Sequence, residues 1–191
     1  MKSAISAFDR YAGEYDRWFD THPAIFREQI SLIRSVLPEG GMRLEVGVGP
    51  GRFASSLGIR HGIDPSPALL TLARIRGVET VQGAGEFLPY RANTFDSVLM
   101  MTVICFMSDP ARSFREAFRV LRPGGSLVTA FLEKDGEVAR RAEAPEYAGR
   151  FLRYATFFSA DDVTALLSAA GFSRIFLRHS LHGLCVLIAQ K

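Results

Sequence analysis

The chain has 191 residues, 48% of them hydrophobic and 23% charged, a composition that fits one globular domain and excludes long disordered stretches. Its formal net charge is +3, and its arginines are spread along the whole chain instead of lying in one block, so we expect no nucleic-acid partner. The N-terminus lacks the apolar core of a signal peptide, and no apolar run approaches the ~18 residues of a membrane span. We therefore expect a cytoplasmic protein.

Two cysteines, Cys105 and Cys185, stand far apart in separate apolar runs. Buried free thiols in a reducing compartment are expected for such a pair. The chain has no CxxC or CxxH spacing and no cluster of His, Asp and Glu at ligand spacing. We therefore predict no metal site.

Residues 1–38 are predicted to form a helical cap. Aromatic side chains recur at helical spacing between Phe8 and Phe19, which indicates a helix with an aromatic stripe. A second helix, residues 25–37, ends at the Pro-Glu-Gly-Gly sequence that follows it.

From residue 44 onward, the hydrophobic pattern alternates between short strands and helices. Short apolar runs that end at turn signals predict strands at residues 44–48, 59–63, 78–82, 95–104, 127–132, 173–179 and 183–189. Helices are predicted between them, at residues 52–57, 67–76, 109–121 and 163–170. The almost wholly apolar run 95–104 is typical of a strand that is buried on both faces.

This order of elements predicts an α/β fold, with a doubly wound, mostly parallel sheet of seven strands. The last two strands are close enough in sequence to pair as an antiparallel C-terminal hairpin. No internal repeat or linker is visible, so we predict a single domain over residues 1–191. A polar, arginine-rich segment at about 133–158 has no clear strand pattern, and we interpret it as an inserted cap.

A glycine-rich loop joins the first predicted strand to the helix behind it. Gly47, Gly49 and Gly51 alternate with other residues there, and glycines at such a turn let a ligand approach the backbone closely. Asp64 ends the second predicted strand, 19 positions after Glu45. In a doubly wound sheet its carboxylate would lie beside the first crevice, where it can accept hydrogen bonds from ribose hydroxyls.

A nicotinamide or flavin dinucleotide is the alternative ligand for such a loop. Its fingerprint, GxGxxG, needs glycine or alanine at the third position so that helix and strand pack closely. This chain has GxGxG, and the bulky Arg52 occupies that third position. A nicotinamide-dependent oxidoreductase is therefore the less favoured function.

Several motifs resemble, in the same order, those of class I S-adenosylmethionine-dependent methyltransferases. The loop from Glu45 to Gly51 resembles their motif I, and residues 62–66 resemble the strand end that binds the ribose. Residues 85–90 and 95–98 resemble the adenine loop and fourth strand of the ubiquinone/menaquinone-biosynthesis type. The same group is matched by residues 8–16, 121–125 and 158–172. On these motifs the chain is identified as a member of the family, with its Rossmann-like methyltransferase fold.

The resemblance implies S-adenosylmethionine as the methyl donor, S-adenosylhomocysteine as the product and a small molecule as the methyl acceptor. It implies that backbone groups of Gly47 and Gly49 contact the methionine moiety and that Glu45 orders its amino group. Asp64 would bind the ribose diol, and Pro65 would pack near the adenine. The cofactor-binding candidates are Glu45, Gly47, Gly49, Gly51, Asp64, Pro65, Gly85, Glu86, Met101 and Thr102.

The later candidates take their roles from the same resemblance. Gly85 and Glu86 would border the adenine, and Met101 and Thr102 would present carbonyls to the amino group. Members of the family often carry an aspartate where this chain has Ala84, so adenine recognition here would rest on backbone amides. The missing acid slightly supports the alternative to a methyltransferase activity, which is a cofactor-binding regulatory module that keeps the fold without efficient catalysis.

Methyl transfer from a sulfonium needs little covalent help, so a catalytic base is optional. His22 is the leading candidate base because it follows the aromatic helix, although an exposed loop histidine is an equal alternative. Tyr15 is the second catalytic candidate. We predict that Tyr15 and Trp18 close over the cofactor, with Tyr11 nearby; the alternative is that the aromatic stripe is core packing. We expect a monomer or a homodimer.

Overall fold

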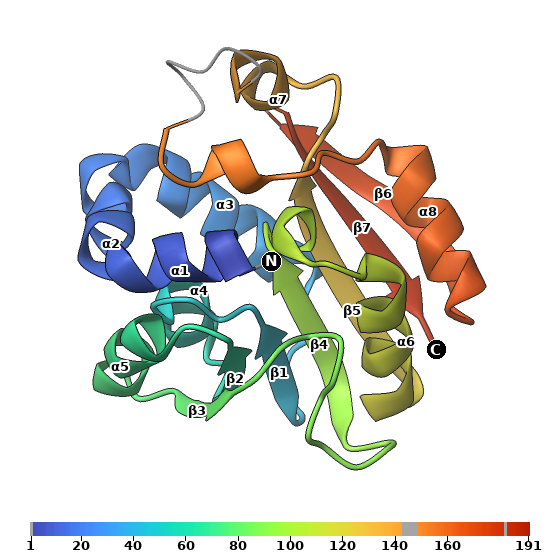
Figure 1. Cartoon of the computed structure of the whole chain (residues 1–191). Helices are drawn as coiled ribbons and strands as arrows, with labels where there is room; N and C mark the ends of the chain where they lie inside the picture. Colours follow the sequence, from blue (N-terminus) through green and yellow to red (C-terminus); the bar gives the residue numbers. More distant parts are fainter. Residues whose placement is uncertain (1, 143–148, 182) are drawn as a thin grey trace.

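A seven-stranded sheet forms the centre of the structure, a computed structural model that describes residues 2–142, 149–181 and 183–191. Its strands are β1 (Arg43–Val46), β2 (His61–Asp64), β3 (Glu79–Gln82), β4 (Phe95–Met101), β5 (Leu121–Leu132), β6 (Ser173–Leu181) and β7 (Leu184–Gln190). They lie in the order β3-β2-β1-β4-β5-β7-β6 (Figure 1).

The pairing of the strands is parallel in the first part of the chain and antiparallel in the last. Strand β1 pairs in parallel with β2 and β4, and the pairs β2–β3 and β4–β5 are parallel as well. Strand β7 pairs antiparallel with both β5 and β6. The predicted α/β sheet with an antiparallel C-terminal hairpin is therefore confirmed. The strand order reverses between β1 and β4, and ligands of doubly wound sheets bind at this point, beyond the carboxyl ends of the strands.

Helices cover both faces of the sheet. They are α1 (Lys2–Arg10), α2 (Ala12–Thr21), α3 (Pro23–Val36), α4 (Arg52–Leu57), α5 (Pro67–Ile75), α6 (Pro110–Val120), α7 (Glu137–Ala142) and α8 (Ala160–Ala169), with short 3-10 helices η1 (Ile104–Phe106) and η2 (Leu152–Tyr154). Helices α3, α4 and α5 share one hydrophobic core with the sheet, and α6 and α8 share the other. None of the helices in the described part of the chain is long and apolar enough to cross a membrane.

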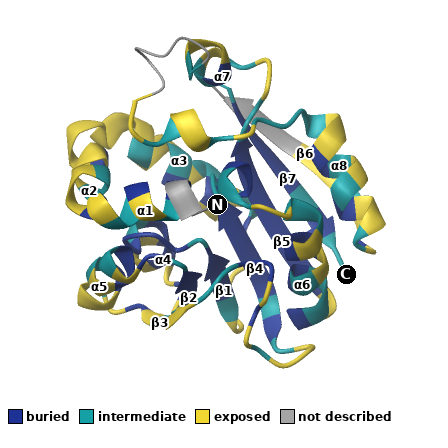
Figure 2. Cartoon of the chain, in the orientation of Figure 1, coloured by how far each residue is buried: buried dark blue, intermediate teal, exposed yellow. Residues whose placement is uncertain are grey.

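Strand β4 contributes side chains to both hydrophobic cores. Val98 and Met100 belong to the core under α6 and α8, whereas Leu99 and Met101 belong to the core under α3 to α5. Successive side chains of a strand point to opposite faces, so a strand covered on both sides must be apolar at every position. The central strands are accordingly buried along their length, while the outer faces of the helices are exposed (Figure 2).

The N-terminal aromatic stripe belongs to two helices and not to one, which corrects the prediction. The backbone of Tyr11 has φ −114° and ψ 26°, outside the helical region, and it separates α1 from α2. The change of direction brings the rings of Phe8 and Tyr15 into an edge-to-face contact with centroids 5.1 Å apart. Helix α1 lies against the carboxyl end of β4 (Figure 1).

Two strand boundaries differ from the prediction by more than two residues. Strand β4 ends at Met101 because Thr102 has a φ of +48°, which an extended strand does not tolerate. Strand β5 begins earlier than predicted, because Leu121 already pairs with Phe95 before the chain makes an excursion through Gly124, whose φ is +80°.

The predicted cap at 133–158 is described only in part, since residues 143–148 lie outside the described residues. The part that follows them contacts the N-terminal helices. The ring of Phe151 stacks on Phe8 with centroids 4.8 Å apart, and Arg150 Nε lies 3.0 Å from a carboxylate oxygen of Glu14. The guanidinium of Arg150 also lies over the ring of Tyr11. Segments about 140 residues apart in the sequence therefore meet on one side of the sheet.

Candidate active site

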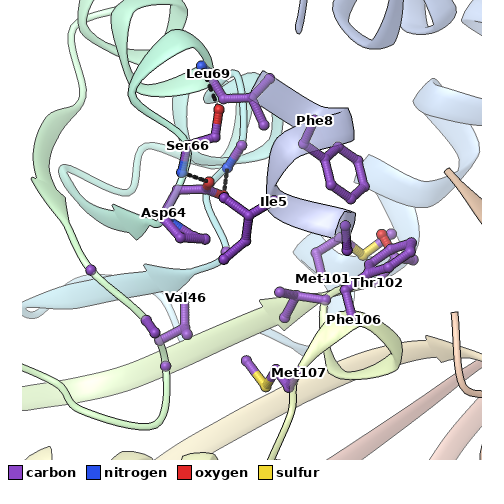
Figure 3. Close-up of a pocket in the computed structure, with 18 of the residues that line it drawn as sticks. Ile5, Phe8, Val46, Asp64, Ser66, Leu69, Met101, Thr102, Phe106 and Met107 are labelled. Atoms are coloured by element: carbon purple, nitrogen blue, oxygen red, sulfur yellow. Dashed lines mark hydrogen bonds between the residues drawn. The ribbon is translucent and has the colours of Figure 1, made fainter. Parts of the chain in front are cut away.

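A pocket lies at the carboxyl ends of the central parallel strands, beside α1 (Figure 3). Its walls come from the loops after β1, β2, β3 and β4 and from the helices α1 and α2. Eight of the ten predicted cofactor-binding residues line it: Gly47, Gly49, Asp64, Pro65, Gly85, Glu86, Met101 and Thr102. The position of the pocket is the one that a doubly wound sheet predicts.

Asp64 is the buried acid of this pocket. It ends β2, and its side chain is held by two backbone amides: Oδ2 accepts a hydrogen bond from Gly49 N and Oδ1 accepts one from Ser66 N, both at 2.9 Å. Burial raises the pKa of Asp64 to about 6, although both hydrogen bonds favour the charged form and oppose this shift. Each carboxylate oxygen accepts only one of these bonds and can accept another from a ligand.

The three glycines of the loop after β1 have different surroundings. A Cβ at Gly47 would overlap the side chain of Val103, whereas a Cβ at Gly49 would meet only the Tyr15 ring, at 3.8 Å. Gly49 therefore leaves open space on the pocket side of the loop. Gly51 does not line the pocket, and its Cβ would lie 2.8 Å from the backbone of Ala73 in α5. Gly51 therefore packs closely against α5, and a part in binding the cofactor stays a prediction.

Glu45 lies next to this loop but is absent from the pocket wall. Its side chain is only 1% exposed, and within the described residues its Oε2 atom has no hydrogen-bond partner. Burial raises the pKa of Glu45 well above its usual value, and the charge of Asp64 raises it further. A buried carboxyl oxygen without a partner is costly, so a donor from a bound ligand would stabilise it.

The loop after β3 forms the opposite wall. Ala84 and Gly85 line the pocket there, and a Cβ at Gly85 would lie 2.8 Å from Met107, so this loop packs closely against the segment that follows η1. The Glu86 carboxylate accepts hydrogen bonds from the amide and hydroxyl of Ser108, both at 3.0 Å, and from Asp109 N. Glu86 therefore borders the pocket while its carboxylate holds the start of α6.

The end of β4 supplies a third wall. Thr102 adopts a left-handed backbone, which is rare for a β-branched residue and occurs mostly at functional sites. Its carbonyl accepts a hydrogen bond from the Cys105 thiol at 3.4 Å. Burial raises the pKa of that thiol to about 12, so Cys105 stays protonated and is not a nucleophile.

Helices α1 and α2 complete the pocket with apolar and aromatic side chains. Ala4, Ile5 and Phe8 come from α1, and Tyr15 comes from α2. Burial raises the pKa of Tyr15 above its usual value, and Asp64 adds to the shift. Its phenol therefore stays protonated near neutral pH and can donate a hydrogen bond, but it is not a base.

Comparisons with known proteins decide the family. A family model described as a methyltransferase domain matches residues 44–129. The chain is 32% identical to a protein of known structure from Thermotoga maritima, described as a SAM-dependent methyltransferase and possible histamine N-methyltransferase. The two superpose with a TM-score of 0.89 over 97% of this chain and 99% of the other. This chain belongs to the class I S-adenosylmethionine-dependent methyltransferases.

Curated relatives are similar to most of this chain. An uncharacterized protein of Methanocaldococcus jannaschii, MJ1123, is 35% identical over 90% of this methyltransferase and 83% of its own length. A ubiquinone biosynthesis O-methyltransferase of Xanthomonas oryzae is 28% identical over 82% of this chain and 73% of its own length. The family confirms the predicted enzyme class over the nicotinamide-dependent alternative.

The pocket of this methyltransferase fits S-adenosylmethionine by the chemistry of its donors and acceptors. The molecule carries an amino group and ribose hydroxyls, which are hydrogen-bond donors, and a sulfonium cation. The pocket and its floor offer two buried carboxyl groups, Asp64 and Glu45, one of which has an oxygen without a described partner. The open space at Gly49 lets a ligand reach the backbone between them.

Two predicted residues lie outside the pocket. His22 does not line it: its ring stacks on Trp18 with centroids 4.6 Å apart, and its Nδ1 lies within hydrogen-bond distance of the Trp18 carbonyl and the Thr21 hydroxyl. Trp18 does not line it either and is 37% exposed. Neither ring borders the pocket, so we withdraw His22 as a candidate base and Trp18 as part of a lid.

Other pocket residues were missed at the level of sequence. Phe8 and Ile5 line the pocket in addition to Tyr15, and Phe106 and Met107 face them from the segment after β4 (Figure 3). The Phe8 and Phe106 rings meet edge to face with centroids 5.0 Å apart. An available signal was the pair of apolar residues directly beyond the carboxyl end of the fourth strand, which a doubly wound sheet places at its ligand site.

Proposed function

We propose that this methyltransferase transfers the methyl group of S-adenosylmethionine to a small-molecule acceptor in the pocket beside α1. The observation that carries the proposal is the position of the Asp64 carboxylate, which is buried at the end of β2 and bonded to the amide of Gly49 in the glycine loop. This arrangement suits a ribose, whose hydroxyls can donate to the two carboxylate oxygens.

The remaining cofactor contacts follow from this placement of the ribose. Pro65 and Gly85 would enclose the adenine, with Ala84 offering no side-chain acceptor. At the other end, the backbone of Gly49 and the unpartnered oxygen of Glu45 would receive the methionine moiety and its amino group. The Asp64 carboxylate, ionised at neutral pH, would also stabilise the positive charge of the cofactor.

The chain contributes position and a dry environment to the reaction. When bound, S-adenosylmethionine supplies a methyl group on a positively charged sulfur, which is an excellent leaving group. Three aromatic rings would exclude water from the end of the pocket beside α1 and orient the acceptor there; they belong to Phe8, Phe106 and Phe151. Tyr15, held as a protonated phenol, would donate a hydrogen bond to the acceptor.

A small, largely apolar acceptor is supported by the side chains on this side of the pocket. Ile5, Phe8, Phe106 and Met107 offer apolar and aromatic surface of the kind that binds planar small molecules. The Thermotoga protein is described as a possible histamine N-methyltransferase and the Xanthomonas relative as a ubiquinone biosynthesis O-methyltransferase. Small aromatic amines and phenols are therefore the first acceptors to test.

Residues 1–38 and the segment at 133–158 would act as caps on one domain that works as a monomer or a homodimer. Their contacts through Phe8 and Phe151 support a joint role in closing the pocket. The two free, buried cysteines support a reducing compartment, the cytoplasm.

The proposal is tested by incubating the protein with methyl-labelled S-adenosylmethionine and a panel of small aromatic amines and phenols. We expect label in one class of acceptor and S-adenosylhomocysteine as the second product. Cofactor binding without transfer to any member of a broad panel would favour the rival function, a regulatory module. An Asp64→Ala variant serves as the control, because transfer by this variant at the wild-type rate would contradict the role given to Asp64.

A further inference from the structure

Asp9 of α1 does not line the pocket and has no role in the function proposed above. Asp9 follows Phe8, so the two side chains leave the helix in different directions. One carboxylate oxygen of Asp9 accepts a hydrogen bond from the hydroxyl of Ser66 at 2.9 Å and another from Ala68 N at 3.0 Å. Asp9 therefore fastens α1 to the first turn of α5, where a negative charge is favoured.

Ser66 connects this fastening to the ribose-binding acid. Its amide donates to Asp64 Oδ1, and its hydroxyl oxygen accepts a hydrogen bond from Leu69 N at 3.3 Å (Figure 3). The Ser66 hydroxyl has one proton, which it donates to Asp9. Asp9, Ser66 and Asp64 thus form one chain of hydrogen bonds that ends at the amide of Gly49.

A second acid holds the N-terminal helices without touching this chain. Asp16 of α2 bonds Arg52 at 2.7 Å and Arg76 at 2.8 Å, and its side chain is 14% exposed. Asp20 bonds Arg52 as well but is exposed at 60%. Attachment of the cap as a whole can therefore be weakened at Asp16 while Ser66 and Asp64 keep their contacts.

We propose that Asp9 is a positioning residue that couples the docking of α1 to the geometry of the cofactor's ribose site through Ser66. With α1 docked, Asp9 holds the Ser66 hydroxyl, and Ser66 in turn holds the Asp64 carboxylate for the ribose. Coupling of two sites is reciprocal, so the bound cofactor also holds α1, with Ile5 and Phe8, against the pocket. The inference rests on the proposed function, because the ligand of Asp64 is the cofactor.

Binding of S-adenosylhomocysteine, measured by calorimetry, tests this coupling. We expect Asp9→Ala to weaken binding about tenfold, the scale of one or two charge-assisted hydrogen bonds, and Asp9→Asn to weaken it less because one acceptor oxygen stays. The exposed Asp20→Asn serves as the matched control and should bind like the wild type. Unfolding by urea confirms that each variant is folded under the conditions of the titration.

A double-mutant cycle separates this mechanism from loosening of the cap in general. Because Asp9 acts through Ser66, Asp9→Ala and Ser66→Ala together should cost clearly less than the product of their separate effects. When Asp16→Asn is combined with Ser66→Ala, the two separate losses of affinity should instead multiply. If the losses of affinity from Asp9→Ala and Ser66→Ala multiply in the double variant, the inference is overturned.

Hydrogen exchange gives a readout that does not depend on transfer. In the wild type, S-adenosylhomocysteine should slow exchange of the α1 amides, and Asp9→Ala should abolish most of that protection. If the wild type binds S-adenosylhomocysteine and Asp9→Ala binds it equally well, the Asp9 inference fails alone. If the wild type does not bind it at all, the proposed function fails, and the inference that rests on it fails too.

Discussion

Replacing Asp64 by asparagine should change how the stability of the ligand-free protein depends on pH. Burial raises the pKa of this carboxyl from 3.8 to about 6, so between these values the folded state binds a proton that the unfolded state has lost. Stability therefore falls as pH rises through this window. With ~1.4 kcal/mol for each pKa unit, the ionised Asp64 lowers the free energy of unfolding by about 3 kcal/mol at neutral pH.

Asparagine has a similar shape and does not ionise. The free energy of unfolding of Asp64→Asn, minus that of the wild type, should therefore rise by about 2.4 kcal/mol between pH 4 and pH 7, because part of the unfolded protein is still protonated at pH 4. Asp64→Asn also carries a penalty at both pH values, because Gly49 N and Ser66 N bond different carboxylate oxygens and asparagine replaces one of these with an NH2 donor. Urea unfolding followed by circular dichroism at several pH values measures this difference.

Subtracting the free energy of unfolding of the wild type from that of Asp64→Asn removes the pH-dependent contribution of the carboxyl groups that both proteins contain. Asp20→Asn is the matched control, since the pKa of Asp20 is lowered, chiefly by its hydrogen bond to Arg52, and its removal should give no rise toward neutral pH. Parallel curves for the wild type and Asp64→Asn between pH 4 and pH 7 would refute the reasoning.

Cofactor affinity of the wild type should fall below pH 6, where the protonated Asp64 loses acceptor strength.

The other predictions concern the glycine loop, the withdrawn base and metal ions. Gly49→Ala and Gly124→Ala both place a Cβ at positive φ with no clash nearby, so each should lose roughly 1 kcal/mol of stability, yet only Gly49→Ala should lose affinity for S-adenosylhomocysteine in calorimetry. His22→Ala should leave kcat/KM within about twofold of the wild type, because its ring lies against Trp18 outside the pocket; a tenfold loss in a steady-state assay would restore it as a candidate base. Methyl transfer should survive EDTA, since a sulfonium needs no Lewis acid to leave; activity lost to the chelator and recovered with magnesium would contradict this.

The sheet and the cofactor side of the pocket could be predicted because their signals are local. Each strand end carries its own pattern: glycines 47 and 49 follow β1 directly, and Asp64 closes β2. Parallel strands bring these ends to one edge of the sheet whatever the intervening helices do. The role of Gly51 is harder to predict, because the spacing of glycines does not distinguish a residue that faces a ligand from one that packs against the helix α5.

The acceptor side could not be predicted, since it depends on contacts between distant segments. A single aromatic stripe placed Tyr15 and Trp18 over the cofactor, but the backbone breaks at Tyr11, and Phe8 of α1 lines the pocket with Tyr15 while Trp18 does not. Phe151 reaches the same cluster from the far end of the chain. Periodicity gives the faces of a helix, but the direction of the next helix after a one-residue break depends on tertiary packing.

A crystal structure of the protein with S-adenosylhomocysteine tests the central claim most directly. We predict that the ribose hydroxyls bond the Asp64 carboxylate, that the adenine lies between Pro65 and Gly85, and that the amino-acid end lies over Gly49 toward Glu45. A ligand bound elsewhere, or bound in this pocket with its ribose away from Asp64, would contradict the account.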